Sequence, residues 1–123
     1  MSKKILIIED EPDIRKTIEY NLAREGFEIH TAASIGDGRS ILNHSFALLV
    51  LDLMLPDGSG LDLCREIKSN KTLSNIPIVI LTAKDDEVDK VVGFELGADD
   101  YVTKPDGVRG LILRIKAMLQ SGN

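Results

Sequence analysis

Apolar residues along the chain follow two alternating patterns. Short segments rich in apolar or β-branched residues are predicted strands, and they lie near residues 3–8, 27–32, 47–52, 76–81 and 98–103. Between them, apolar residues recur every three to four positions, which indicates amphipathic helices; the clearest stripe covers residues 108–119. Strands that alternate with helices predict an α/β fold, with a doubly wound parallel sheet of five strands and with five helices.

The ends of the predicted helices carry matching signals. Pro12 suits the first turn of the first helix, and Gly26 suits its C-terminal cap. Ser34 and Ser59 are the predicted N-caps of the second and third helices. The fourth helix, near residues 85–96, is rich in valine and contains a glycine, so we expect tertiary contacts to hold it in place.

Acidic side chains close two of the predicted strands. Asp52 ends the apolar segment 47–51, and Glu9, Asp10 and Glu11 follow the first strand. Open α/β sheets place their ligands at the carboxyl ends of the strands, so these side chains should meet in one crevice. Two carboxylates about 4 Å apart repel by roughly 4 kcal/mol at an effective dielectric constant of about 20, so such a cluster needs compensation: one acid is protonated, a lysine or arginine is added, or a metal ion is bound. Oxygen ligands without a nearby histidine or cysteine favour Mg²⁺ or Mn²⁺.

Two further strand ends add a hydroxyl and an ammonium group. The segment 76–81 is followed by Thr82-Ala83, and the segment 98–103 is followed by Lys104-Pro105. A metal ion, hydrogen-bond donors and a point charge are what a transferring phosphoryl group requires. The pattern therefore predicts that Asp52 is a nucleophile that forms an aspartyl phosphate.

Length, charge and cysteine content narrow the classes of protein that remain. The 123 residues are predicted to form one domain, residues 1–123. The net charge of −5, without a basic stripe, gives no reason to expect direct nucleic-acid binding. The single cysteine, Cys64, excludes an internal disulfide and fits a reducing compartment. Neither a signal peptide nor a run of membrane-spanning length is visible, so we expect a cytoplasmic protein without membrane association.

Taken together, these motifs resemble the receiver domain of two-component response regulators, from Lys4 to about Leu119. The motifs that carry the resemblance are Glu9-Asp10, Asp52 with Pro56-Asp57-Gly58, Thr82-Ala83, and Tyr101 with Lys104-Pro105. The resemblance implies a single-domain flavodoxin-like fold with strand order 2-1-3-4-5. It also implies a phosphorylation-dependent signalling switch, to which a histidine kinase or a phosphotransfer protein donates the phosphoryl group.

The resemblance also assigns the metal site residue by residue. Asp10 resembles the direct ligand of Mg²⁺, for which Mn²⁺ can substitute, and Glu9 resembles the acid that acts through a water molecule. Asp52 resembles both a metal ligand and the phosphoryl acceptor. The backbone carbonyl of Met54 resembles the main-chain ligand of the family.

Three other residues receive roles from the same resemblance. Lys104 resembles the lysine that pairs first with the acceptor and then with the phosphoryl oxygens. Thr82 and Tyr101 resemble the switch pair: the hydroxyl moves onto the phosphoryl group and the ring turns inward. The surface of the fourth helix, fifth strand and fifth helix then changes to control an output.

A receiver of this kind is not a conventional enzyme, but it catalyses its own aspartyl phosphorylation and dephosphorylation. In the family, two side chains near the acceptor affect hydrolysis, and here they correspond to Met54 and Lys84. A methionine cannot orient a water molecule by hydrogen bonding, so we expect slow dephosphorylation.

Within the family, the chain is most similar to transcription regulators that carry a winged-helix effector. In those proteins one face forms a phosphorylation-dependent homodimer through ion pairs, and the corresponding residues here are Lys90, Glu95, Asp99, Asp100, Arg114 and Lys116. The expected partner is an output domain or a partner protein. The chain departs from the pattern at Asp106 and Gly107, and Gly110 stands where a glutamate would pair with Lys90 across the dimer.

Three other functions are compatible with parts of the pattern. A phosphatase with an aspartate nucleophile normally has a second aspartate two residues on, where this chain has Met54. A flavin or nucleotide binder would need a phosphate cradle, but the turn after the first strand is acidic and free of glycine. A pure interaction module that has lost phosphorylation would not need the intact set of site residues.

Overall fold

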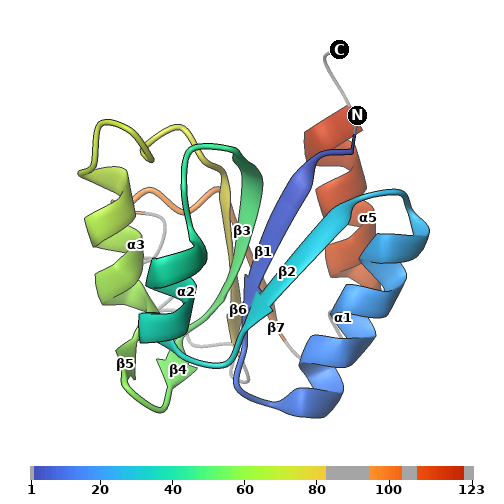
Figure 1. Cartoon of the computed structure of the whole chain (residues 1–123), viewed down its shortest axis with the longest axis horizontal. Coiled ribbons are helices and arrows are strands. Elements are labelled where there is room, and N and C mark those ends of the chain that lie inside the picture. The colour runs from blue at the N-terminus through green and yellow to red at the C-terminus, as the bar shows by residue number, and fades with distance from the viewer. Residues whose placement is uncertain (1, 83–94, 104–107, 121–123) are drawn as a thin grey trace.

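A computed structural model describes residues 2–82, 95–103 and 108–120 of the chain (Figure 1). Five parallel strands form one sheet in the order β2-β1-β3-β6-β7. Their bounds are β1 Lys4–Ile8, β2 Glu28–Ala32, β3 Phe46–Asp52, β6 Ile78–Thr82 and β7 Asp100–Thr103. A separate antiparallel hairpin, β4 (Met54–Leu55) and β5 (Gly58–Ser59), follows β3. With this hairpin set aside, the sheet has the predicted order 2-1-3-4-5, so the doubly wound parallel fold is confirmed.

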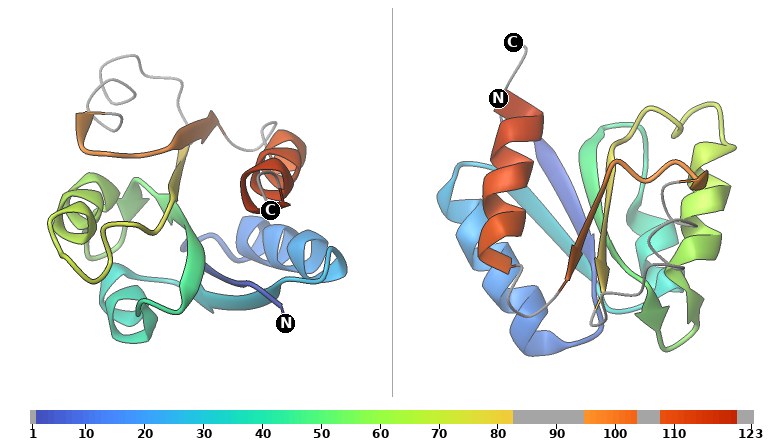
Figure 2. Two further views of the ribbon diagram at one scale, coloured as in Figure 1. Left: turned by 90° about the horizontal axis from the view of Figure 1, so that it is seen from above. Right: turned by 180° about the vertical axis from the view of Figure 1, so that it is seen from behind.

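Helices cover both faces of the sheet, two on each side among the described residues (Figure 2). Their bounds are α1 Pro12–Arg24, α2 Ile35–Ile41, α3 Gly60–Lys68 and α5 Val108–Gln120. Each face has its own apolar core, because successive strand residues point to opposite sides of the sheet. Ile5 and Ile7 join the cluster beneath α1 and α5, whereas Leu6 and Ile8 join the cluster beneath α2 and α3. The central strands are thus buried on both faces, as their apolar composition predicts.

The helix ends follow the predicted signals. Pro12 lies in the first turn of α1, and Gly26 follows that helix with a φ of 94°. This left-handed conformation is accessible to glycine without steric cost. The hydroxyls of Ser34 and Ser59 each accept a hydrogen bond of 3.2 Å from a backbone N–H in the first turn of α2 and α3, respectively.

The predicted fourth helix, near residues 85–96, lies outside the described residues except at its C-terminal end, where Glu95 is helical. Gly97 then turns the chain toward β7 with a φ of 104°. No helix in the described ranges is long and apolar enough to cross a membrane.

Candidate functional site

Three carboxylates meet at the carboxyl edge of the sheet. Glu9 and Asp10 follow β1, and Asp52 ends β3; one oxygen atom from each lies within 4.8 Å of the other two. The strands are direct neighbours, paired through Ile8 and Leu51, which places their acidic ends together. Glu9 and Asp52 are buried, with exposed fractions of 0% and 3%, whereas Asp10 is exposed. The repulsion between buried carboxylates this close together is relieved by protonation or by a cation, and a set made only of oxygen donors fits Mg²⁺ or Mn²⁺.

Backbone contacts fix the acidic turn after β1. The Glu9 N–H donates to the Ala32 carbonyl at 3.0 Å, and the Glu9 carboxylate accepts from the Glu11 N–H at 3.0 Å. From the first helix, the Arg15 guanidinium donates to the carbonyls of Glu9 and Asp10, at 2.8 and 3.3 Å. Arg15 therefore holds the turn that presents the two acids. An arginine in the first turns of a helix is ordinarily a surface charge, so no local pattern in the sequence predicts this role.

The loop after Asp52 is held close to the acid. The Met54 N–H donates to the Asp52 carboxylate at 3.3 Å, and the Gly60 N–H donates to the Leu53 carbonyl at 2.8 Å. A β-carbon built on Gly60 would lie 2.2 Å from the Asp52 carbonyl oxygen, so only glycine permits α3 to begin there. The side chain of Met54 is 77% exposed, beside the acidic cluster in sequence but outside the core.

Asp57 makes a contact that no local pattern in the sequence predicts. Its two carboxylate oxygens accept hydrogen bonds from the N–H groups of Ile35 and Gly36, at 2.8 and 2.9 Å. The bond from Gly36, then that from Ile35, lowers the pKa of Asp57 below its ordinary value of 3.8. Sequence alone indicated only a turn at Pro56-Asp57-Gly58, because the partners of Asp57 lie in a different strand–helix unit.

Thr82 lies on β6, the strand next to β3, and Tyr101 lies on β7, which pairs with β6 at the edge of the sheet. Thr82 ends β6, where Leu81 pairs with Asp52, and it is buried. Tyr101 lies in β7 opposite Ile80 and is buried in the core beneath α2 and α3. The predicted threonine thus ends the strand that pairs with β3, the strand of the predicted acceptor Asp52. Lys104, predicted to complete the site, lies outside the described residues.

Part of the predicted dimer face lies at the start of β7. The Asp99 carboxylate accepts from the Ile78 N–H at 2.8 Å and lies 3.6 Å from the Lys68 ammonium. These contacts tie the segment before β7 to β6 and α3. Glu95 is exposed, and Lys90 lies outside the described residues.

The remaining residues of that predicted face form ion pairs within the chain. The Arg114 guanidinium lies 3.5 Å from the Asp100 carboxylate and donates to the Tyr101 carbonyl at 3.3 Å. The Lys116 ammonium lies 2.9 Å from the carboxylate of Glu25, at the end of α1. Arg114 therefore faces β7, whereas Lys116 reaches toward α1.

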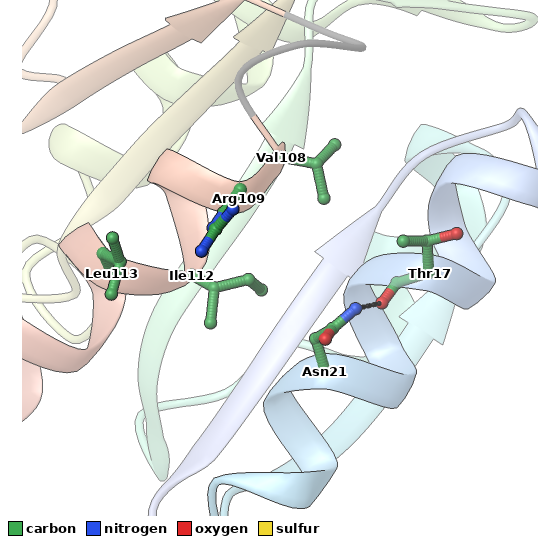
Figure 3. A pocket seen from close by; sticks show the side chains of 6 residues that line it. All are labelled: Thr17, Asn21, Val108, Arg109, Ile112 and Leu113. Atoms are coloured by element: carbon green, nitrogen blue, oxygen red, sulfur yellow. Dashed lines mark hydrogen bonds between the residues drawn. The ribbon is translucent and has the colours of Figure 1, made fainter.

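A hollow of about 440 Å³ lies apart from the acidic cluster, between α1 and α5. Figure 3 shows side chains of the two helices facing each other across it, with the Asn21 amide donating to the Thr17 carbonyl at 2.8 Å. The residues that line it are Thr17, Asn21, Val108, Arg109, Ile112 and Leu113. None of these side chains is a carboxylate, so the hollow is not an extension of the metal site.

Comparison with known proteins agrees with this arrangement. The sequence model of the response regulator receiver domain family matches residues 5–116. The transcriptional regulatory protein GltR of Pseudomonas aeruginosa is 44% identical over 119 residues, which are 96% of this chain and 49% of GltR. The chain therefore spans about half the length of this relative.

Two solved structures have the same fold. The response regulator DrrB of Thermotoga maritima, described as an OmpR/PhoB homologue, has a TM-score of 0.87 at 35% identity, over 98% of this chain and 54% of DrrB. The BeF3-activated DrrB receiver domain has a TM-score of 0.86 at 35% identity, over 98% of this chain and 99% of that domain.

Proposed function

The chain belongs to the response regulator receiver domain family of two-component signalling, and from that premise we propose that Asp52 is its phosphoryl acceptor. One observation carries the proposal: the buried Asp52 carboxylate shares a cluster, within 4.8 Å, with those of Glu9 and Asp10. Asp52 also ends an interior strand at the carboxyl edge of the sheet, where open α/β folds place their ligands.

A Mg²⁺ ion would be held by the carboxylates of Asp10 and Asp52, by the Met54 carbonyl, and by Glu9 through a water molecule; Mn²⁺ would substitute. The oxygen-only donor set and the burial of two of the three acids support this assignment. When bound, the ion offsets the negative charge of the carboxylates and of the incoming phosphoryl oxygens.

In the transfer step, an oxygen of the Asp52 carboxylate attacks the phosphorus of a phosphohistidine on a histidine kinase or phosphotransfer protein. The P–O bond to Asp52 forms as the P–N bond breaks, and the imidazole leaves with the electron pair and takes up a proton. Thr82, at the end of the neighbouring β6, and Lys104 would donate to the phosphoryl oxygens. The chain thereby catalyses its own phosphorylation and, slowly, its own dephosphorylation.

The phosphorylated state would change the surface around β7 and α5. Thr82 and Tyr101 lie on adjacent strands, so a hydroxyl drawn toward Asp52 would leave space near the ring of Tyr101. The change would be read by an output domain, as in a transcription regulator, or by a partner protein in the cytoplasm. The same surface would form a homodimer through Lys90, Glu95, Asp99, Asp100, Arg114 and Lys116.

The test is transfer of labelled phosphate from a phosphohistidine donor in the presence of Mg²⁺. The parent chain should be labelled and Asp52→Ala should not. Asp62→Asn, which removes an exposed carboxylate from the first turn of α3, is the matched control and should be labelled like the parent. Full labelling of Asp52→Ala would reject Asp52 as the acceptor.

A further inference from the structure

One side chain at the tip of the β4–β5 hairpin, which carries Met54, is hydrogen-bonded to the first turn of α2. Asp57 lies at the tip of the hairpin, and its carboxylate receives the backbone N–H groups of Ile35 and Gly36 at 2.8 and 2.9 Å. Both oxygens are used, one for each donor, so the contact fixes the direction of the carboxylate as well as its position. Hydrogen bonds to an ionised acceptor are about twice as strong as neutral ones.

The hairpin approaches α2 closely along its whole tip. A β-carbon on Gly36 would lie 3.4 Å from the Asp57 carboxylate, and one on Gly58 would lie 3.1 Å from the Ile35 side chain. Ile35 and Leu55 are both buried in the same core cluster. The contact between Asp57 and α2 is therefore part of a packed junction.

The same junction is closed on its other side by α3. Arg39 of α2 forms a two-pronged ion pair with Glu66 of α3, with N–O distances of 2.8 and 2.9 Å. Because α3 begins at Gly60 against the Asp52 carbonyl, the loop after Asp52 is held at its end by α3 and at its tip by α2. Figure 1 shows the hairpin at the ends of both helices.

We propose that Asp57 is a positioning residue for the metal centre, which orients the Met54 carbonyl by fixing the hairpin against α2. The inference rests on the proposed function of Met54 as a main-chain ligand. The exposed Met54 side chain does not anchor its own backbone, so the position of the carbonyl depends on the hairpin and on the bond from the Met54 N–H to the Asp52 carboxylate. Met54 is paired to Ser59 within the hairpin, so a displacement of the tip at Asp57 is passed to it. Residues that orient metal ligands commonly affect metal affinity without touching the ion.

The test uses Mn²⁺ as the probe and compares the parent chain with Asp57→Asn. An amide can accept at one oxygen only, and its NH₂ group would face a backbone donor, so the two-pronged contact is lost. We expect the dissociation constant for Mn²⁺ to rise by about tenfold. Water-proton relaxation should show one more water molecule on the bound Mn²⁺, because water replaces the displaced carbonyl.

Two further variants make the result interpretable. Asp37→Asn makes the same chemical change in the first turn of α2, but the Asp37 carboxylate accepts none of the hydrogen bonds described for this chain, so it should behave like the parent. Asp57→Ala removes both acceptor oxygens and should raise the dissociation constant at least as much as Asp57→Asn. Urea unfolding monitored by circular dichroism checks that each variant is folded.

The inference is overturned if folded Asp57→Asn and Asp57→Ala both bind Mn²⁺ like the parent. It is also overturned if affinity falls without the additional water, because the carbonyl would then still be bound. A parent chain that fails to bind Mn²⁺ at all would instead overturn the proposed metal centre.

Discussion

The backbone oxygen of Asp52 lies directly against Gly60, so that a β-carbon at residue 60 would stand 2.2 Å from it. The last residue of β3 and the first residue of α3 are thus in contact through a position without a side chain. Because of this contact, only a short hairpin separates the predicted acceptor Asp52 from the start of α3.

Substitution of Gly60 by alanine is expected to destabilise the fold. The added methyl group meets backbone rather than a flexible side chain, so β3 or α3 must move, and overpacking of this kind costs about 1–3 kcal/mol. The free energy of unfolding in urea measures the effect. An unchanged value would mean that α3 shifts without cost and that the contact with Asp52 is not a constraint.

Gly110 is the opposite case and provides a matched control for Gly60. It lies inside α5, and among the described residues no atom outside its chain neighbours and the nearby backbone of that helix lies within 4 Å of a β-carbon built there. Alanine at this position loses less backbone entropy on folding, so Gly110→Ala should raise the free energy of unfolding by about 0.4–1 kcal/mol. The same urea experiment tests it, and a loss of stability would contradict the open space seen around this residue.

The strands and the acidic cluster could be predicted because their signals are local. The apolar segments define β1 and β3, and parallel pairing then forces Glu9, Asp10 and Asp52 to the same edge. The order of the strands is implied by the resemblance to the receiver family, and the structure confirms it.

The contacts that support the site could not be predicted in the same way. Asp57 binds N–H groups 21 and 22 residues away, and Arg39 pairs with Glu66, 27 residues away. In sequence, each is an ordinary polar residue of a turn or an exposed helix face. Their partners depend on how α2 and α3 pack beside the hairpin, and this packing cannot be inferred from a local sequence pattern.

Removal of a site carboxylate should raise the free energy of unfolding without a metal ion and lower it, relative to the parent, when a metal ion is present. In the absence of divalent cations, Asp10→Asn should raise the free energy of unfolding, because it relieves repulsion with Glu9 and Asp52. With Mg²⁺ at about 100 times its dissociation constant, the free energy of unfolding of the parent should rise by about 2.7 kcal/mol. Asp10→Asn should lose most of that gain. Urea unfolding with Mg²⁺ or with EDTA measures both effects, and equal stability of the parent in the two buffers would exclude a metal centre.

Acidification should remove the stabilising effect of Asp57. Its pKa is lowered in the folded chain by the N–H groups of Gly36 and Ile35, so its contribution is present above the ordinary pKa of 3.8. That contribution is lost as the pH falls through the lower pKa of the folded state. The difference in unfolding free energy between the parent and Asp57→Asn should therefore be constant near neutral pH and shrink below about pH 4. A difference that persists at lower pH would show that the carboxylate charge is not what binds α2.

The phosphorylated state is expected to be long-lived, because the side chain two residues after Asp52 is Met54. This side chain is 77% exposed and has no group able to orient a water molecule for attack on the phosphorus. In Met54→Asn an amide could hold that water through one hydrogen bond, worth about 1 kcal/mol, so hydrolysis should accelerate roughly fivefold. Loss of label from the purified phosphorylated chain measures the rate, and Met54→Leu, which is also apolar, should match the parent. Equal rates in Met54→Asn and Met54→Leu would show that residue 54 does not set the lifetime through water.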